Sequence, residues 1–143
     1  MTLGDVTLAK GTDYTVSYSS NKAIGTATVT VTGAGNYKGT VSANFKIVPA
    51  KVTLSSVTAQ SKAFVAQWVV QSGVSGYQLQ YATSSDFASG KKTVSFASDS
   101  TYKGKVTGLI KGTTYYVKVR AYKEVGGVKN YSSWSSVKSV TVK

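Results

Sequence analysis

The sequence predicts an all-β protein made of two tandem β-sandwich modules, of which the first is incomplete. Among its 143 residues are 21 Val, 18 Thr and 20 Ser, against 5 Leu and 1 Glu, so strand-forming residues greatly outnumber the best helix formers. Apolar and polar residues alternate with a period of two along most of the chain, which is the pattern of half-buried strands. The only proline, Pro49, separates two such stretches and places the domain boundary between residues 1–49 and 50–143.

The first module contains four predicted strands separated by turns. Alternation predicts strands at residues 6–8, 14–18, 27–31 and 41–47, and Gly, Asn and Asp residues mark the turns between them. A segment of fewer than about 50 residues without cysteine buries too little apolar surface to be stable alone. The module therefore either leans on the second one or lacks a strand upstream, in which case the chain is a truncated fragment. With a strand missing, the open edge could recruit a strand from another copy and give a strand-exchange dimer or a donor-strand complex.

Three spaced motifs of the first module carry a family resemblance. The residues at 10–18, KGTDYTVSY, are followed by GTATV at 25–29 and by GAGNYKG at 33–39. In this order they resemble an Ig-like repeat, with its GxGNYxG motif, found in large surface proteins of Gram-positive bacteria. The resemblance covers residues 3–48 and implies a spacer or adhesion repeat that has no catalytic residues. In that family an extra strand usually precedes the point at which this chain begins.

Some sandwiches of Gram-positive surface proteins also carry an isopeptide crosslink between a lysine and an Asn or Asp. In the first module the candidate partners are Asp13 and Asn36, beside Lys10 or Lys38. No further acid is expected in the core beside them, so we expect Asp13 to accept hydrogen bonds from backbone amides of its own turn instead.

The second module contains seven predicted strands, at residues 54–59, 63–70, 76–82, 93–96, 102–107, 114–123 and 133–142. Seven strands in about 94 residues are typical of a two-sheet sandwich of the immunoglobulin class. Side chains of the sixth strand point alternately to its two faces. We expect one face to be core (Tyr115, Val117, Val119 and Ala121) and the other to point outward (Tyr116, Lys118, Arg120 and Tyr122).

Residues 51–143 closely resemble a fibronectin type III domain. Trp68 stands at the family's second-strand tryptophan, Tyr77 begins the third strand, and the run from Leu109 to Tyr115 matches the Leu-x-Pro-Gly-Thr-x-Tyr corner, with Lys111 in place of proline. The resemblance implies structural roles for Trp68, Tyr77, Leu109 and Tyr115. The family's integrin-binding Arg-Gly-Asp loop is absent, so that activity is not implied.

The outward row of the sixth strand has two interpretations. Aromatic rings beside cations suit sugar rings and anionic groups, so Tyr116, Lys118, Arg120, Tyr122 and Trp134 could form a ligand surface. Alternatively, Trp134 on the last strand stacks on Arg120 or Lys118 and forms a cation–π ladder that stabilises the sheet. We favour the ladder.

The net charge of +12 falls mostly on the second module, which holds 13 basic residues against three acids, whereas the first holds four against two. Such a field attracts polyanions of many kinds. Sixteen of the seventeen basic residues are lysines, a weak signature for nucleic acid, so we expect no nucleic-acid partner. The lysines either gather into a binding patch or protect strand edges from pairing with other strands. We favour the second interpretation. This set comprises Lys91, Lys92, Lys103, Lys105, Lys111, Lys118, Lys123, Lys129 and Lys138.

Residue types exclude most catalytic chemistry. The chain has no Cys and no His, and its five carboxylates are scattered. No Gly-x-Ser-x-Gly elbow occurs. We therefore expect no enzyme, no cofactor and no metal site. No apolar run approaches the 18 residues of a membrane helix, so no membrane insertion is expected.

Together these observations predict a non-catalytic extracellular module of a bacterial cell-surface or secreted protein, acting as spacer and adhesion scaffold. The expected partners are the neighbouring domains of the parent chain and a polysaccharide or host surface protein. The alternative is a carbohydrate-binding or polyanion-binding module, for a wall polymer or host glycan, that uses the basic face of the second module.

Overall fold

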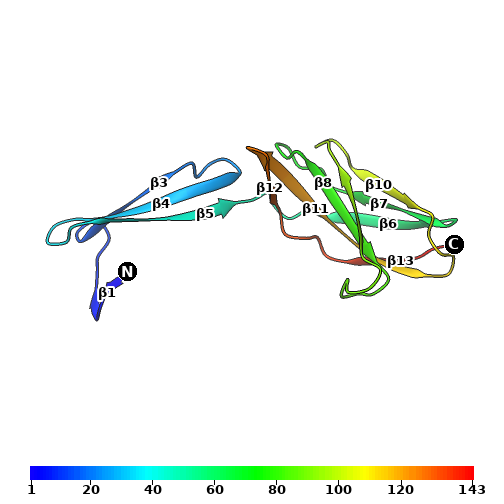
Figure 1. Cartoon of the computed structure of the whole chain (residues 1–143), viewed down its shortest axis with the longest axis horizontal. Coiled ribbons are helices and arrows are strands. Elements are labelled where there is room, and N and C mark those ends of the chain that lie inside the picture. The colour runs from blue at the N-terminus through cyan, green and yellow to red at the C-terminus, as the bar shows by residue number, and fades with distance from the viewer. The chain divides into compact units, whose positions relative to one another are not determined.

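The computed structural model describes residues 1–143 as thirteen β-strands without a helix (Figure 1). No helix is therefore present that is long and apolar enough to cross a membrane. The chain divides into two compact units, Met1–Ile47 (unit 1) and Val48–Lys143 (unit 2).

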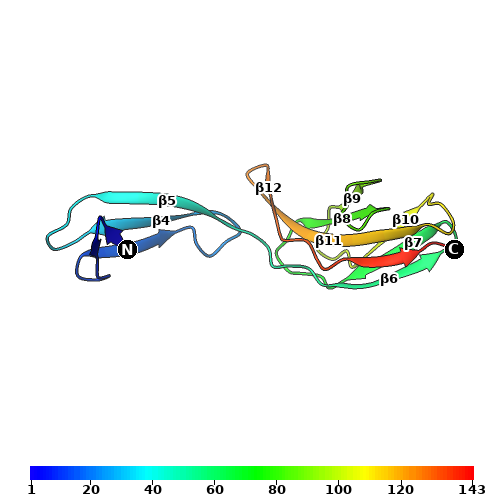
Figure 2. The ribbon, with the colours of Figure 1, turned by 90° about the horizontal axis from the view of Figure 1, so that it is seen from below.

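Unit 1 is a single antiparallel sheet with a small hairpin. The sheet has the order β3–β4–β5, formed by Tyr14–Ser19, Gly25–Gly33 and Thr40–Ile47 (Figure 2). The hairpin pairs β1 (Thr2–Leu3) with β2 (Val6–Thr7). Sequence alternation predicts β2 to β5 in their places but not β1, because a two-residue strand is too short to show a period.

The two faces of the unit 1 sheet differ sharply in polarity. Val16, Val31 and Val41 lie side by side in register on one face. On the other face Thr30 and Ser42 share a hydrogen bond of 2.9 Å, and Lys46 Nζ donates to Thr26 Oγ1 at 2.8 Å. The sheet thus has one apolar and one polar face, as the period of two requires.

Unit 2 is a two-sheet sandwich (Figure 2). Its three-stranded sheet has the order β10–β7–β6, formed by Lys103–Thr107, Ala63–Trp68 and Leu54–Gln60. Its other sheet has the order β12–β11–β8–β9, with β13 also pairing β11. These strands are Val128–Tyr131, Thr114–Val125, Gly76–Ala82, Lys92–Phe96 and, for β13, Lys138–Thr141.

The core of unit 2 lies between these sheets and is rich in aromatic residues. Phe64 from one sheet contacts Tyr81 and Tyr115 from the other, with ring centroids 5.7 and 6.5 Å apart. Trp68 packs on Tyr77 at 5.5 Å in the same way. All five side chains are buried, and the inward face of β11 is formed by Tyr115, Val117, Val119 and Ala121, where alternation predicts it.

Two tyrosine hydroxyls tie the loops of unit 2 to its core. The Tyr115 hydroxyl accepts a hydrogen bond of 3.3 Å from the Ile110 amide, next to buried Leu109, so the corner closes although Lys111 replaces proline. The Tyr77 hydroxyl accepts from the Gln71 amide at 2.7 Å and donates to the Asp99 carbonyl at 3.1 Å. Burial is the main reason that the pKa of Tyr77 is raised.

The prediction of one strand over residues 133–142 is wrong. Only Lys138–Thr141 forms a strand, β13, and a separate strand, β12, pairs with the end of β11 as a hairpin. Between β12 and β13 the chain runs beside β11 without strand pairing, because Ser132 and Ser135 form the hydrogen bonds to β11 there. The second predicted strand also ends early, at Trp68, and leaves Val69 and Val70 exposed.

Candidate functional site

The outer face of the five-stranded sheet carries a stack of alternating rings and cations. The Lys118 ammonium lies 3.7 Å from the ring centroid of Phe87 and 5.0 Å from that of Trp134. The Arg120 guanidinium carbon lies 4.3 Å from Trp134 and 3.7 Å from Tyr131. Phe87, Lys118, Trp134, Arg120 and Tyr131 thus form an aromatic–cation ladder, in which each cation sits between two rings.

Hydrogen bonds anchor the ladder to the neighbouring strands. Arg120 Nε and Nη2 both donate to Gln78 Oε1, at 3.0 and 2.7 Å. Gln78 Nε2 in turn donates to Ser95 Oγ at 3.2 Å. These hydrogen bonds run from β11 over β8 to β9. The Arg120 guanidinium is therefore held by two aromatic rings and by the side-chain amide oxygen of Gln78. Of its five N–H donors, two are used in these bonds.

The position of Lys118 also lowers its affinity for a proton. Desolvation between the rings is the largest cause of its lowered pKa, followed by the nearby charges of Lys91 and Arg120. The contact with two ring faces acts in the opposite direction, since it stabilises the ammonium form. The rings of the ladder therefore both desolvate the Lys118 ammonium and stabilise its charge.

Two buried serines hold the chain between β12 and β13 against β11. The Ser132 amide donates to the Ala121 carbonyl and the Ala121 amide donates to Ser132 Oγ, both at 3.0 Å. Ser135 repeats this arrangement with Val119, at 2.8 and 3.0 Å. Each serine thus provides one donor, its amide, and one acceptor, its Oγ, as a paired strand residue would provide with its amide and carbonyl. Trp134 lies between the two serines, over the outer face of the sheet.

The predicted outward row is brought together only in part. Lys118, Arg120 and Trp134 meet in the ladder. Tyr122 is buried under Tyr131, with ring centroids 6.0 Å apart, and Lys129 Nζ lies 4.8 Å from the Tyr122 ring. Tyr116 is half-buried on the same strand but outside the ladder.

Sequence reasoning missed Phe87, Tyr131 and Gln78. Phe87 lies in the loop between β8 and β9 with φ of 60°, a conformation unusual for a bulky residue. The loop is held by Asp86, whose Oδ1 accepts from Ser84 at 2.6 Å and from the Ala88 amide at 3.0 Å; these bonds lower the pKa of Asp86. A lone aromatic residue among small polar ones is a weak signal, so Phe87 was not predictable.

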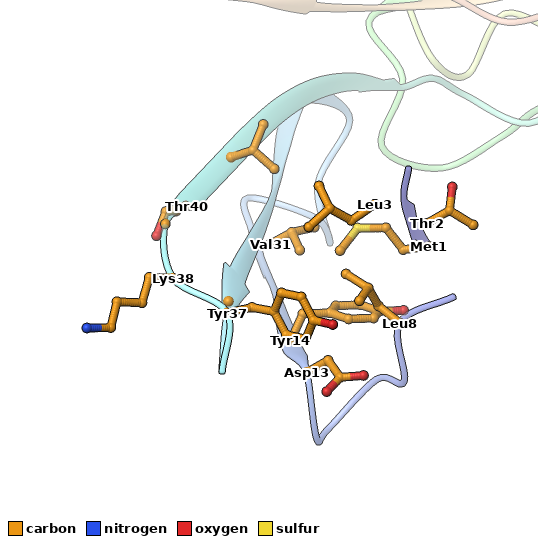
Figure 3. Close-up of a pocket in the computed structure, with 13 residues that line it drawn as sticks. Met1, Thr2, Leu3, Leu8, Asp13, Tyr14, Val31, Tyr37, Lys38 and Thr40 are labelled. Atoms are coloured by element: carbon orange, nitrogen blue, oxygen red, sulfur yellow. The ribbon is translucent and has the colours of Figure 1, made fainter. Parts of the chain in front are cut away.

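Unit 1 has a cavity of about 420 Å³ between its hairpin and one end of its sheet (Figure 3). Apolar side chains from both parts line it, Leu3 and Leu8 from the hairpin region and Tyr14 and Val31 from the sheet. Asp13 lies at its rim and its Oδ2 accepts a 2.8 Å hydrogen bond from the Ala9 amide, so the predicted turn role of Asp13 is confirmed.

The other candidate isopeptide partners, Lys10, Asn36 and Lys38, are exposed. No group of three or more His, Cys, Asp or Glu side chains gathers anywhere in the structure.

Comparison with solved structures supports the sandwich fold. One similar structure is described as a myokine structure, with a TM-score of 0.54 and 16% identity over 66% of this chain and 97% of that chain. The chicken CNTN1 FN1–FN3 domains give a TM-score of 0.58 and 24% identity over 87% of this chain and 45% of theirs. At these identities the likeness shows the fold alone. This chain spans less than half of the CNTN1 fragment.

Comparison with curated proteins gives no match. In a comparison with protein families, the fibronectin type III domain matches residues 48–138, which begin at the first residue of unit 2. This match covers well over half of the sequence. The chain therefore belongs to the fibronectin type III domain family.

Proposed function

We propose that this chain is a non-catalytic spacer and adhesion scaffold of a bacterial cell-surface or secreted protein. Fibronectin type III domains are typically non-catalytic modules of extracellular or multidomain proteins, which supports this proposal in outline. The resemblance of residues 3–48 to a repeat of Gram-positive surface proteins supports the bacterial origin.

The observation that carries the spacer role is that the chain enters and leaves unit 2 at opposite ends. Gln71 Nε2, beyond the end of β7, donates to the carbonyls of Ala50 and Lys51 at 2.9 and 3.2 Å. At the other end of β7 the Lys62 amide donates to the Lys143 carbonyl at 2.8 Å. The six residues of β7 span about 20 Å between these points. Modules with such termini join end to end and extend a chain.

Pulling unit 2 between its first and last residues tests this role. Force between Val48 and Lys143 shears the backbone hydrogen bonds that connect Lys143 to the β6–β7 turn. Unit 2 should therefore unfold in one resolved step. The contour-length gain should correspond to Val48–Lys143 at about 3.5 Å per residue, less the folded length. Extension without a force peak would contradict a stiff spacer.

The alternative function is binding of a polyanion, which the charge of unit 2 favours. Lys92 begins edge strand β9 and both Lys103 and Lys105 lie on edge strand β10, which supports the edge-protection interpretation. Lys118 and Arg120 lie between the rings of the ladder, and Lys91 is close enough to lower the pKa of Lys118, so three cations gather at this point of the surface.

Two matched double variants distinguish a localised binding site from non-specific electrostatic attraction by the whole unit. One variant, Lys91→Ser/Lys92→Ser, removes two exposed charges at the start of β9. The other, Lys103→Ser/Lys105→Ser, removes two exposed charges from β10, which belongs to the other sheet. We expect binding to heparin and teichoic acid to weaken equally in both and to vanish at physiological salt, as a screened field requires. Saturable binding that survives this salt and is lost in only one variant would favour the binding-module alternative.

A further inference from the structure

The apolar face of the unit 1 sheet is only partly covered. We name as the unit 1 apolar face Val16, Tyr18, Val29, Val31, Val41 and Phe45, which share one side of the three strands by register. Tyr18 is 55% exposed, Val41 64% and Phe45 39%. The hairpin lies beside only the end of this face that borders the cavity, at Val31 and Val41.

This exposure contrasts with unit 2, where the corresponding inward side chains are packed against a second sheet. In unit 2 Phe64, Leu79 and Val119 are fully buried. Within unit 1 there is one three-stranded sheet and, apart from the two-stranded hairpin, no second sheet. An apolar sheet face of this kind is stabilised by a second sheet about 10 Å away that offers a matching apolar face.

We propose that the unit 1 apolar face packs against the same face of a second copy of this chain. Two three-stranded sheets related by a twofold axis then form one six-stranded sandwich with the Thr and Ser faces outward. Such an interface is self-complementary, because each copy supplies the same patch. The inference does not depend on the spacer role.

Charge favours self-association at unit 1 over any other part of the molecule. Unit 1 holds four lysines and two aspartates, whereas unit 2 holds 13 basic residues and three acids. The unit 1 apolar face itself carries no charged side chain. Repulsion between two copies is therefore smallest here, and an acidic partner would find no cation on this face.

The size of the face predicts a weak dimer. Three strands of six to nine residues cover roughly 15 Å by 20–30 Å, or a few hundred Å² on each copy. Two copies would therefore bury about 600–900 Å² in total, which is less than the roughly 1,000 Å² that a stable specific interface needs. We therefore expect dissociation in the micromolar to millimolar range.

Sedimentation velocity over a concentration series tests the proposal. The mass of the whole chain should rise from 15.0 kDa toward twice that value. Val41→Lys should weaken association by about tenfold or more, since it replaces a buried valine by a charge in the dimer. Ser42→Lys adds the same charge on the opposite face of the same strand and should leave association within about twofold of the wild type, as expected of surface substitutions.

Tyr18→Lys, on another strand, gives an independent variant of the same face. Because Tyr18 and Val41 are both more than half exposed, neither substitution removes much buried surface from the single chain, and Val41→Ser serves where the lysine disturbs the sheet. The proposal is overturned by a mass that stays at one chain throughout. It is equally overturned when Val41→Lys and Ser42→Lys act alike, or when a dimer persists in both face variants, which would indicate edge pairing or strand exchange.

Discussion

Replacing Phe64 by alanine is expected to lower the free energy of unfolding of unit 2 by about 3–5 kcal/mol, the usual cost of truncating a buried phenylalanine. Phe64 is fully buried and its ring bridges the two sheets through Tyr81 and Tyr115. Its removal leaves a cavity that two flanking tyrosines cannot easily fill. Since domains of this size are stable by about 5–15 kcal/mol, a large part of the stability should be lost.

Urea unfolding followed by tryptophan fluorescence measures this loss. The only two tryptophans, Trp68 and Trp134, both lie in unit 2, so the signal reports on that unit alone. The control is Val65→Ala, the next residue on β7, which points to the other face and is half-buried. A loss for Phe64→Ala no larger than that of the control would contradict the described core.

The all-β fold of the protein was predictable because the period of two is a local property of the sequence. Val117 and Val119 alternate with Lys118 and Arg120, and this pattern alone assigns the core and outer faces of β11. The corner at Tyr115 was likewise recognisable from its motif. Both depend on residues close in sequence.

The ladder was predictable only in its centre. Lys118, Arg120 and Trp134 lie on segments whose neighbourhood in the sheet follows from the resemblance to the family. Phe87 reaches Lys118 from a loop held by Asp86, and nothing in the loop's composition indicates the direction of that ring. Tertiary contacts of this kind depend on loop geometry, which a pattern of polarity does not encode.

The strand prediction for the chain between β12 and β13 is wrong for a different reason. The aromatic–serine pairs Tyr131-Ser132 and Trp134-Ser135 repeat with a period of three, not two. Three residues per turn is the period of an extended polyproline II helix. This spacing differs from the period of two of a strand and agrees with the break in strand pairing between β12 and β13.

The two buried serines of this segment should be as important for stability as a core side chain. Ser135→Ala removes the acceptor of the Val119 amide and Ser132→Ala removes that of the Ala121 amide, at sites where both serines are buried. A buried amide left without a partner costs about 1–3 kcal/mol. The double variant should therefore lose about 2–6 kcal/mol if the two sites act independently.

Ser133→Ala and Ser136→Ala are matched controls, because both residues lie in the same segment with exposed side chains. Each should change the free energy of unfolding by less than about 0.5 kcal/mol. The buried pair should also alter the native fluorescence of Trp134, since the serines on either side hold its ring between Lys118 and Arg120. Should Ser135→Ala cost no more than Ser136→Ala, the hydroxyl would not be acting as a strand partner. The ladder would then depend on the stacking of its own rings and cations alone.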